Sequence, residues 1–156
     1  MNEEKTAVRP DATVTLREIT RDTLRDILRL KVTDVQDNFV APNAVSIAEA
    51  YFEPKAWFRG IYADETAVGF AMLYVNEEKP IYYLWRYMIA APYQKMGFGA
   101  QAMTLLIEHV RTYPNAKRFL LSYVPQLEGP RDFYAKLGFI DTGEVHDGEN
   151  EMALEL

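Results

Sequence analysis

The sequence predicts an α+β fold of the broad α/β class, with a mixed, mostly antiparallel sheet flanked by helices. Three apolar segments, at 57–62, 67–75 and 80–90, follow one another with only short polar connections between them. Such short connections join antiparallel strands, because a parallel pair needs a long crossover. Segments of helical period lie before and after these strands, and a loop with two glycines leads from the last strand into a helix. The 80–90 segment is apolar or aromatic almost throughout, so we expect it near the centre of the sheet.

The chain before these strands begins with a predicted strand and a predicted helix. Thr13–Ile19 alternates apolar and polar residues, as a half-buried strand does. Thr20 is a suitable N-cap for a helix over Arg21–Lys31, in which Leu24, Ile27 and Leu28 share one face. The charged residues of this helix are expected on its outer side.

A second short helix is expected after a polar and aromatic passage at Val32–Asn43. Ser46 and Glu49 have the spacing of a capping box, in which each side chain bonds a free N–H of the first helical turn. This spacing predicts a helix that ends at about Phe52.

The chain after the glycine loop predicts two helices and three strands. Pro114-Asn115 ends a helix that starts at Phe98, and His109 is interpreted as a residue of that helix end rather than a catalyst. A turn at 146–149 suits a hairpin. The expected elements are a helix from Phe98 to about Tyr113, a strand Arg118–Val124, a helix Gly129–Leu137, and a hairpin of Phe139–Val145 and Asn150–Leu156.

Composition limits the classes of function. The 156 residues contain 17 basic and 23 acidic side chains, a formal charge of −6, which argues against a nucleic-acid partner and permits a cationic substrate. Without any Cys, thiolate metal sites and thiol nucleophiles are excluded, and the two histidines lack metal spacing, so no metal is expected. Residues 1–12 are expected to be a flexible N-terminal segment without a secretory signal, ahead of one domain at 13–156. The longest apolar stretch, Ile81–Ala91, is short and contains Arg86, so we expect a cytoplasmic protein without a membrane span.

The loop between the 80–90 strand and the following helix has the chemistry of an anion site. Gly97 and Gly99 have no Cβ, so ligand oxygens can approach the backbone there. The first N–H groups of a helix have no partner within the helix and carry its positive dipole end. A tight turn without a ligand is the alternative for two loop glycines.

Two motifs in this order resemble the signatures of the GNAT N-acetyltransferases. Gln94-x-x-Gly97-x-Gly99 is similar to their Q/R-x-x-G-x-G/A loop, and Tyr134-Ala135-Lys136-Leu137-Gly138-Phe139 is similar to their Y-x-K-L-G-F segment. The predicted order β-α-α-β-β-β-α-β-α-β-β also agrees with the GNAT fold. Further segments resemble the bacterial diamine, spermine or spermidine acetyltransferases; they are 39–43 with 46–50, 84–89, 121–125, and 142–144 with 147–149.

The resemblance implies acetyl-CoA as the acetyl donor and co-substrate. The residues that it places at the donor are Met88 and Ile89 beside the pantetheine, and Gln94, Lys95, Met96, Gly97, Phe98, Gly99 and Ala100 around the pyrophosphate. Lys95 has a simpler alternative, since an exposed loop lysine is often only solvated.

Tyr134 occupies the family position of the general acid that protonates the departing CoA thiolate. The alternative is a tyrosine that packs the helix with its hydroxyl on a carbonyl. No base is evident, because 82–87 contains no Asp or Glu where many family members carry a carboxylate. Deprotonating an alkylamine at pH 7 costs roughly 4–5 kcal/mol, so a water path lined by Tyr83 or Tyr87 is the remaining expectation.

A polyamine acceptor needs carboxylates for its ammonium groups and aromatic side chains for its methylenes. The candidates are Glu49, Asp37, Phe39, Tyr83 and Trp85, with Asp34, Glu53 and Tyr51 as further members of the set. Glu49 has the alternative role of partner to Ser46, and Trp85 that of a core residue.

The sequence leaves two other functions open. The same chemistry on another amine, such as a protein N-terminus, an amino acid or an aminoglycoside, fits the donor motifs equally well. A non-catalytic acyl-CoA-binding sensor fits the absence of a strand carboxylate. The partners expected are a small-molecule amine and, from the resemblance, a second copy in a homodimer.

Overall fold

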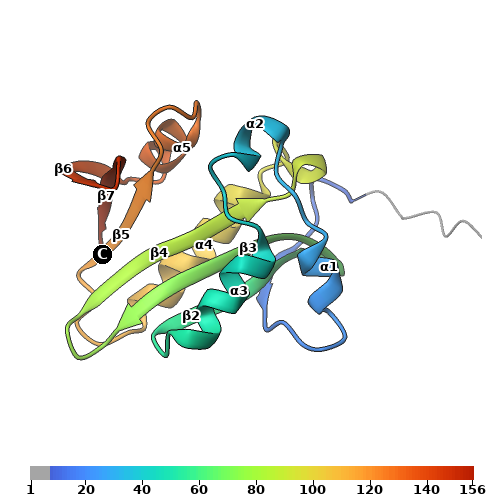
Figure 1. Ribbon diagram of the computed structural model, residues 1–156, viewed down its shortest axis with the longest axis horizontal. Helices are drawn as coiled ribbons and strands as arrows, with labels where there is room; N and C mark the ends of the chain where they lie inside the picture. The colour runs from blue at the N-terminus through green and yellow to red at the C-terminus, as the bar shows by residue number, and fades with distance from the viewer. Residues whose placement is uncertain (1–7) are drawn as a thin grey trace, which may run out of the picture.

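The computed structural model describes residues 8–156, whose seven-stranded sheet has the order β1-β2-β3-β4-β5-β7-β6 (Figure 1). The elements are β1 Val14–Arg17, α1 Leu24–Leu28, α2 Asp34–Asp37, α3 Asn43–Phe52, β2 Ala56–Ala63, β3 Thr66–Asn76, β4 Ile81–Ile89, the 3-10 turn η1 Ala91–Tyr93, α4 Phe98–Arg111, β5 Arg118–Tyr123, α5 Pro130–Lys136, β6 Ile140–His146 and β7 Glu149–Glu155. The flexible segment expected at 1–12 falls largely on residues 1–7, outside the described residues. The predicted strands and the antiparallel character of the sheet are confirmed.

The central position of β4 follows from its composition. Apolar and aromatic residues occupy nearly all of it, which suits a strand covered on both faces. It is the fourth of seven strands, antiparallel to β3 and parallel to β5, and the remaining pairs in the sheet are antiparallel.

A bulge in β4 separates it from β5. Leu84 faces Leu73 and Arg86 faces Met72 on β3, so Trp85 is an extra residue without a cross-strand partner. Beyond Leu84 the parallel pairing with β5 also stops, since only Tyr83 and Leu84 are paired with that strand. The two strands therefore diverge next to the bulge, as Figure 1 shows.

Helices cover both faces of the sheet, and each face has its own core. On one face α4 buries Phe98, Ala102, Met103, Leu106 and Val110 against β strands, and α5 packs beside it. On the other face α1 and α3 cover a smaller cluster that contains Ile27, Phe70, Met72 and Met88. The predicted α4 starts at Phe98 as expected, because Gly97 with φ +84° turns the chain into it.

The first two helices differ from their predictions. α1 is one short helix with Thr23 as N-cap, and Thr23 Oγ1 accepts from the Thr20 N–H, so Thr20 does not cap it. It ends early because Leu30 and Val32 turn inward to the smaller core. The passage at 32–43, which carried no predicted helix, contains α2 with a capping box of Thr33 and Gln36.

The predicted capping box of Ser46 and Glu49 is wrong. α3 begins at Asn43 after Pro42, and buried Asn43 donates from Nδ2 to the Ile27 carbonyl over 2.9 Å. Ser46 therefore lies within the helix, and Glu49 forms an ion pair with Arg86 instead.

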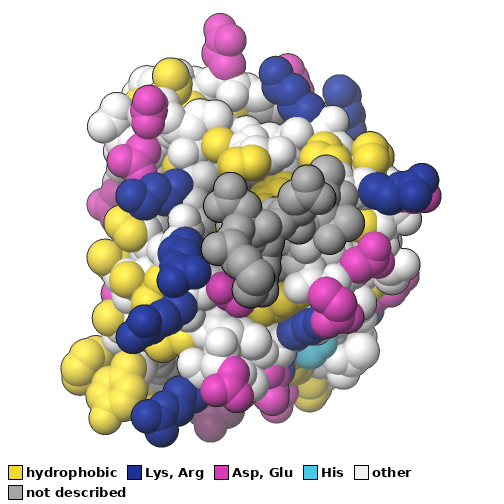
Figure 2. Space-filling view, turned by 90° about the vertical axis from the view of Figure 1, so that its right-hand side faces the viewer, with side chains coloured by type: hydrophobic (Ala, Val, Ile, Leu, Met, Phe, Trp, Pro, Cys, Tyr) yellow, Lys and Arg dark blue, Asp and Glu magenta, His cyan; other side chains and the backbone are white. Residues whose placement is uncertain are grey.

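Charges of both signs are interspersed on the visible part of the face in Figure 2, where apolar side chains gather at one edge. Within 8–156, no helix has the length and apolarity to cross a membrane. The same residues contain no cluster of three side chains able to hold a metal ion.

We expect Gly69→Ala to destabilise the fold by about 3 kcal/mol, the upper end of the range for overpacking. A Cβ at Gly69 would lie 2.4 Å from the Met88 carbonyl oxygen, which is backbone of β4 and cannot turn away. Gly60→Ala is the matched control, since its Cβ would meet only side-chain ends of Ile27 and Tyr62, at 2.8 and 2.9 Å. Urea unfolding of both variants measures the difference, and equal midpoints would contradict the rigid β3–β4 contact.

Candidate active site

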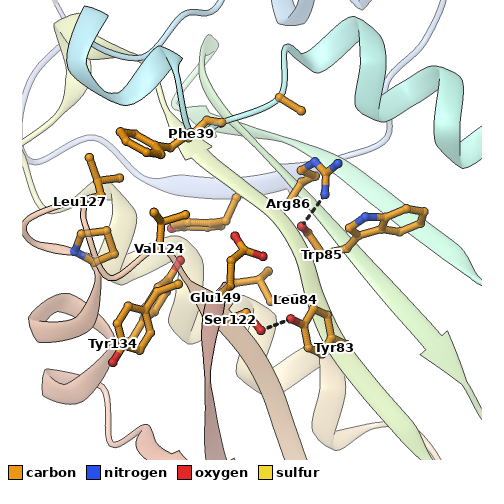
Figure 3. Close-up of a pocket in the computed structure, with 15 residues that line it drawn as sticks. Phe39, Tyr83, Leu84, Trp85, Arg86, Ser122, Val124, Leu127, Tyr134 and Glu149 are labelled. Carbon is orange, nitrogen blue, oxygen red and sulfur yellow. Dashed lines mark hydrogen bonds between the residues drawn. The ribbon is translucent and has the colours of Figure 1, made fainter. Parts of the chain in front are cut away.

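A cavity of about 480 Å³ opens where β4 and β5 diverge (Figure 3). Its walls come from the bulged part of β4, the end of β5 and the following loop, α5, the loop before α3, and the start of β7. The lining residues are Phe39, Val40, Ala41, Tyr83, Leu84, Trp85, Arg86, Tyr87, Ser122, Tyr123, Val124, Leu127, Pro130, Tyr134 and Glu149. Segments far apart in the sequence thus meet at one gap in the sheet.

Residues of both cores line the cavity. Leu84 and Tyr123 belong to the core under α4, and Tyr87 and Tyr134 pack against the same core. Val40 and Trp85 pack against the core under α1 and α3. A molecule in the cavity would therefore contact residues that belong to the α4 side and to the α3 side of the sheet.

The N-terminus of α4 has the geometry of an anion site. Its first helical bond runs from the Gln101 N–H to the Gly97 carbonyl, so the N–H groups of Phe98, Gly99 and Ala100 have no acceptor within the helix. A Cβ at Gly97 would have nothing nearer than Gln101 Nε2 at 4.0 Å, so the space beside this backbone is open. The residues present fit the pyrophosphate expected from the sequence.

The side chains of this predicted donor segment point in different directions. Phe98 is fully buried and Met96 packs on the same core, so both offer a ligand only their backbone. Lys95 is exposed, with a left-handed φ of +62°, which leaves its ammonium group in solvent near the loop. Met88 is buried in the smaller core, and Ile89 Cγ1 would lie 3.6 Å from a Cβ at Gly99.

Gln94 has a clear structural role. Its Nε2 donates to the Ile89 carbonyl over 2.8 Å and to Gln36 Oε1 over 2.9 Å. Because Gln36 is also the capping-box residue of α2, these bonds attach α2 to the loop that precedes α4. Gln94 therefore shapes the anion site through the backbone that it holds.

Tyr134 lies at the cavity with its hydroxyl free. The ring packs edge-on against Phe133 and Phe139, and among residues 8–156 its hydroxyl has no hydrogen-bond partner. Burial raises the pKa of Tyr134 well above its ordinary value, so the group is protonated at neutral pH. The alternative role, in which the Tyr134 hydroxyl bonds a carbonyl, has no such hydrogen bond among the described residues.

The two tyrosines considered for a water path are both hydrogen-bonded. Tyr87 donates to the Gly99 carbonyl over 2.5 Å. The pKa of Tyr87 is raised, mainly because the group is buried and to a smaller extent because Tyr134 lies nearby. The Tyr83 hydroxyl bonds Ser122 Oγ at the opposite side of the cavity from Tyr134. Burial raises the pKa of Tyr83, and the charges of Glu149 and Glu151 raise it further.

Glu149 is a cavity residue that the sequence did not reveal as a site residue. In Figure 3 its carboxylate points into the middle of the cavity. The sequence does indicate that Glu149 begins a strand, because Asp147 and Gly148 form the left-handed turn of the hairpin and Glu149 is the first residue after it. Which side of the sheet that residue faces depends on the pairing of β7 with β5, and the sequence does not state this pairing.

The predicted acceptor residues divide into two groups. Phe39, Tyr83 and Trp85 line the cavity, while Glu49 stands behind Arg86, with 3.2 Å between Glu49 Oε2 and the Arg86 guanidinium. Asp37 lies elsewhere. Together with Asp34 it lines a second cavity of about 420 Å³ that also contains Lys31.

Comparison with known proteins gives one family. Residues 17–139 match the model of the acetyltransferase (GNAT) family. No curated protein matches the sequence.

Solved structures share this fold at low sequence identity. A spermidine N-acetyltransferase SpeG chimera from Vibrio cholerae and hSSAT has a TM-score of 0.70 at 17% identity, over 91% of this chain and 94% of that one. PaiA N-acetyltransferase from Thermoplasma acidophilum, in complex with coenzyme A, has a TM-score of 0.68 at 15% identity, over 92% of this chain and 99% of that one. Arabidopsis thaliana Naa50, with a bisubstrate analogue, has a TM-score of 0.66 at 16% identity, over 92% of this chain and 99% of that one. At such identities the likeness shows a common fold.

We expect Gly97→Val to weaken acetyl-CoA binding more than tenfold, or by over ~1.4 kcal/mol, because its side chain would fill the open space beside the α4 N-terminus. Backbone strain at φ +84° would add a stability loss of about 1–2 kcal/mol. Gly143→Val separates the two effects, because Gly143 has φ +87°, also lies in open space, and belongs to β6 away from the loop. Calorimetric titration should show lost affinity only for Gly97→Val; equal affinities in folded proteins would refute the anion site.

Proposed function

The chain belongs to the acetyltransferase (GNAT) family, and from that premise we propose that it transfers acetyl from acetyl-CoA to a primary amine of a diamine or polyamine. Transfer is by direct attack in a ternary complex, since the chain has no Cys to carry the acetyl group. The observation that carries this proposal is the cavity at the gap between β4 and β5, with Tyr134 on its wall and with Tyr87, also on its wall, bonded to the Gly99 carbonyl at the α4 N-terminus.

The chain's own groups have distinct roles at the donor. The N–H groups of Phe98, Gly99 and Ala100 hold the pyrophosphate, and the segment at Met88 and Ile89 lies beside the pantetheine. Acetyl-CoA supplies the thioester when bound. Tyr134, protonated and free of internal bonds, gives its proton to the departing thiolate sulfur.

A diamine or polyamine acceptor fits the walls of the cavity. Glu149 offers a carboxylate for an ammonium group, and Phe39, Tyr83 and Trp85 offer aromatic faces for the methylenes. Spermidine N-acetyltransferases are among the proteins with the same fold, which supports this acceptor class.

An amino acid is the second candidate acceptor. Arg86 also lines the cavity, and its Nε is buried without a partner among residues 8–156. A guanidinium group binds carboxylates well, so an acceptor that carries both an amine and a carboxylate would use Arg86 and Glu149 together. A sensor without catalysis is disfavoured by the free hydroxyl of Tyr134.

Three further expectations belong to the proposal. Residues 13–156 form one acetyltransferase domain, and the protein works in the cytoplasm. A homodimer is supported by Tyr51 and Phe52 at the end of α3, two residues that are 84% and 81% exposed and whose rings pack edge to face.

An amine panel tests the acceptor class. We expect thiol release from acetyl-CoA to be fastest with putrescine, spermidine or spermine, at least tenfold above a monoamine of equal length in kcat/KM. Amino acids, an aminoglycoside and a short peptide complete the panel. Faster turnover of amino acids would establish the second candidate, and binding of acetyl-CoA without turnover of any amine would make the protein a sensor.

Tyr134→Phe tests the general acid, because it removes the hydroxyl and keeps the ring's packing. We expect kcat to fall by about 10²–10⁴ with little change in acetyl-CoA affinity. Stability should stay within about 0.5 kcal/mol, since no internal hydrogen bond is lost. Single-turnover rates and urea midpoints measure both quantities. A rate within threefold of the parent would remove Tyr134 from the mechanism.

A further inference from the structure

The reaction needs a proton acceptor that β4 does not supply. An alkylamine is an ammonium ion at pH 7 and must lose a proton before its nitrogen can attack. The residues at 82–87 of β4 contain no carboxylate, and Tyr83 and Tyr87 have raised pKa values that keep them neutral. Among the described residues that line the cavity, Glu149 is the single carboxylate.

The strand pairing fixes Glu149 on the acceptor side of the gap. Ser122 on β5 faces Glu151 on β7, and Glu149, two residues before Glu151, points to the same side of the sheet. Tyr83 on β4 shares that side, since its hydroxyl bonds Ser122. The Glu149 carboxylate therefore stands across the gap between β4 and β5, beside Tyr83 and Ser122.

Glu149 is also the carboxylate that its neighbours leave free. Within 8–156 it forms neither an ion pair nor a hydrogen bond, whereas Glu151 binds Thr142 over 3.0 Å and His146 over 3.0 Å. Arg86, the one cation among the described residues that line the cavity, is already paired with Glu49. An entering ammonium ion thus meets one uncompensated negative charge, that of Glu149.

We propose that Glu149 is the general base that takes the proton of the acceptor's ammonium group. This inference rests on the proposed acetyl transfer. One N–H bond of the ammonium breaks and its proton moves to a Glu149 carboxylate oxygen, which leaves the lone pair on nitrogen. That pair forms the new C–N bond at the thioester carbon, a second N–H proton leaves the now positively charged nitrogen for solvent, and the C–S bond breaks with its electrons on sulfur. The sulfur takes the Tyr134 proton, and the proton on Glu149 returns to Tyr134 through solvent.

Glu149→Gln tests the base, because it keeps the size of the side chain and removes its basicity. We expect kcat with the best amine of the panel to fall by about 10²–10⁴, while acetyl-CoA affinity stays unchanged. Glu151→Gln is the matched control, two residues along the same strand and side but outside the cavity wall, and should stay within threefold of the parent.

A second acceptor separates a base from a residue that only places the substrate. A fluorinated analogue whose attacking nitrogen is largely neutral at pH 7 needs no proton removed before attack, so the loss in kcat at saturating acceptor should shrink by at least tenfold for Glu149→Gln, whereas a residue that only binds the ammonium group would change KM. An equal loss for both acceptors, a change in KM alone, or an unchanged rate would each overturn the assignment. If the parent turns over no amine, the proposed function fails and this inference fails with it. If the parent acetylates the amine and Glu149→Gln does so at the same rate, only the assignment of Glu149 as the base is refuted.

Discussion

The site depends on how few residues β4 shares with β5. A central strand normally satisfies its backbone on both edges, yet the parallel pairing here covers only Tyr83 and Leu84. The bulge at Trp85 bends β4 away and raises its local twist, so the pairing cannot resume along the strand. Beyond that point the backbone groups on one edge of β4 face the cavity instead of a strand. A bound molecule can satisfy them, which makes the gap a site for an extended ligand rather than a packing defect.

The same bulge sets the electrostatics of the acceptor side. Without it, Trp85 and Arg86 would point to opposite faces, but the extra residue places Arg86 opposite Met72, on the side of α3. There Glu49 reaches the guanidinium from the second turn of α3. The ion pair is partly exposed, with side-chain exposures of 27% for Arg86 and 40% for Glu49, so solvent screens it and it adds little to the stability of the fold. Its main effect is to neutralise the charge of Arg86. With Arg86 neutralised, the field in the cavity is set by Glu149.

The glycine loop and the helix start at α4 were predictable because their causes are local. Consecutive residues determine both features: Gly97 adopts the left-handed conformation and Phe98 begins the helix. The acceptor half was not. The capping box of Ser46 and Glu49 failed because Pro42 and buried Asn43 start the helix earlier, through a bond to Ile27 in another helix. Glu149 was missed because the side it faces is set by cross-strand register, and a shift of one residue would turn it away.

This division bears on how the acceptor is chosen. The α4 N-terminus and its loop use backbone groups, which vary little with side-chain identity, so the donor site is held by the fold itself. The acceptor walls come from three distant segments, the loop at Phe39, the bulged strand and the start of β7. The start of α4 is held by other side chains, Gln94 with Gln36 and Tyr87 with the Gly99 carbonyl. Among the described residues, Phe39, Trp85 and Glu149 form no hydrogen bond to that loop, so each can change without moving it. Because Glu149 is the single carboxylate among the described residues that line the cavity, a substitution there changes the charge that an entering amine meets, whereas the backbone groups at the α4 N-terminus stay the same.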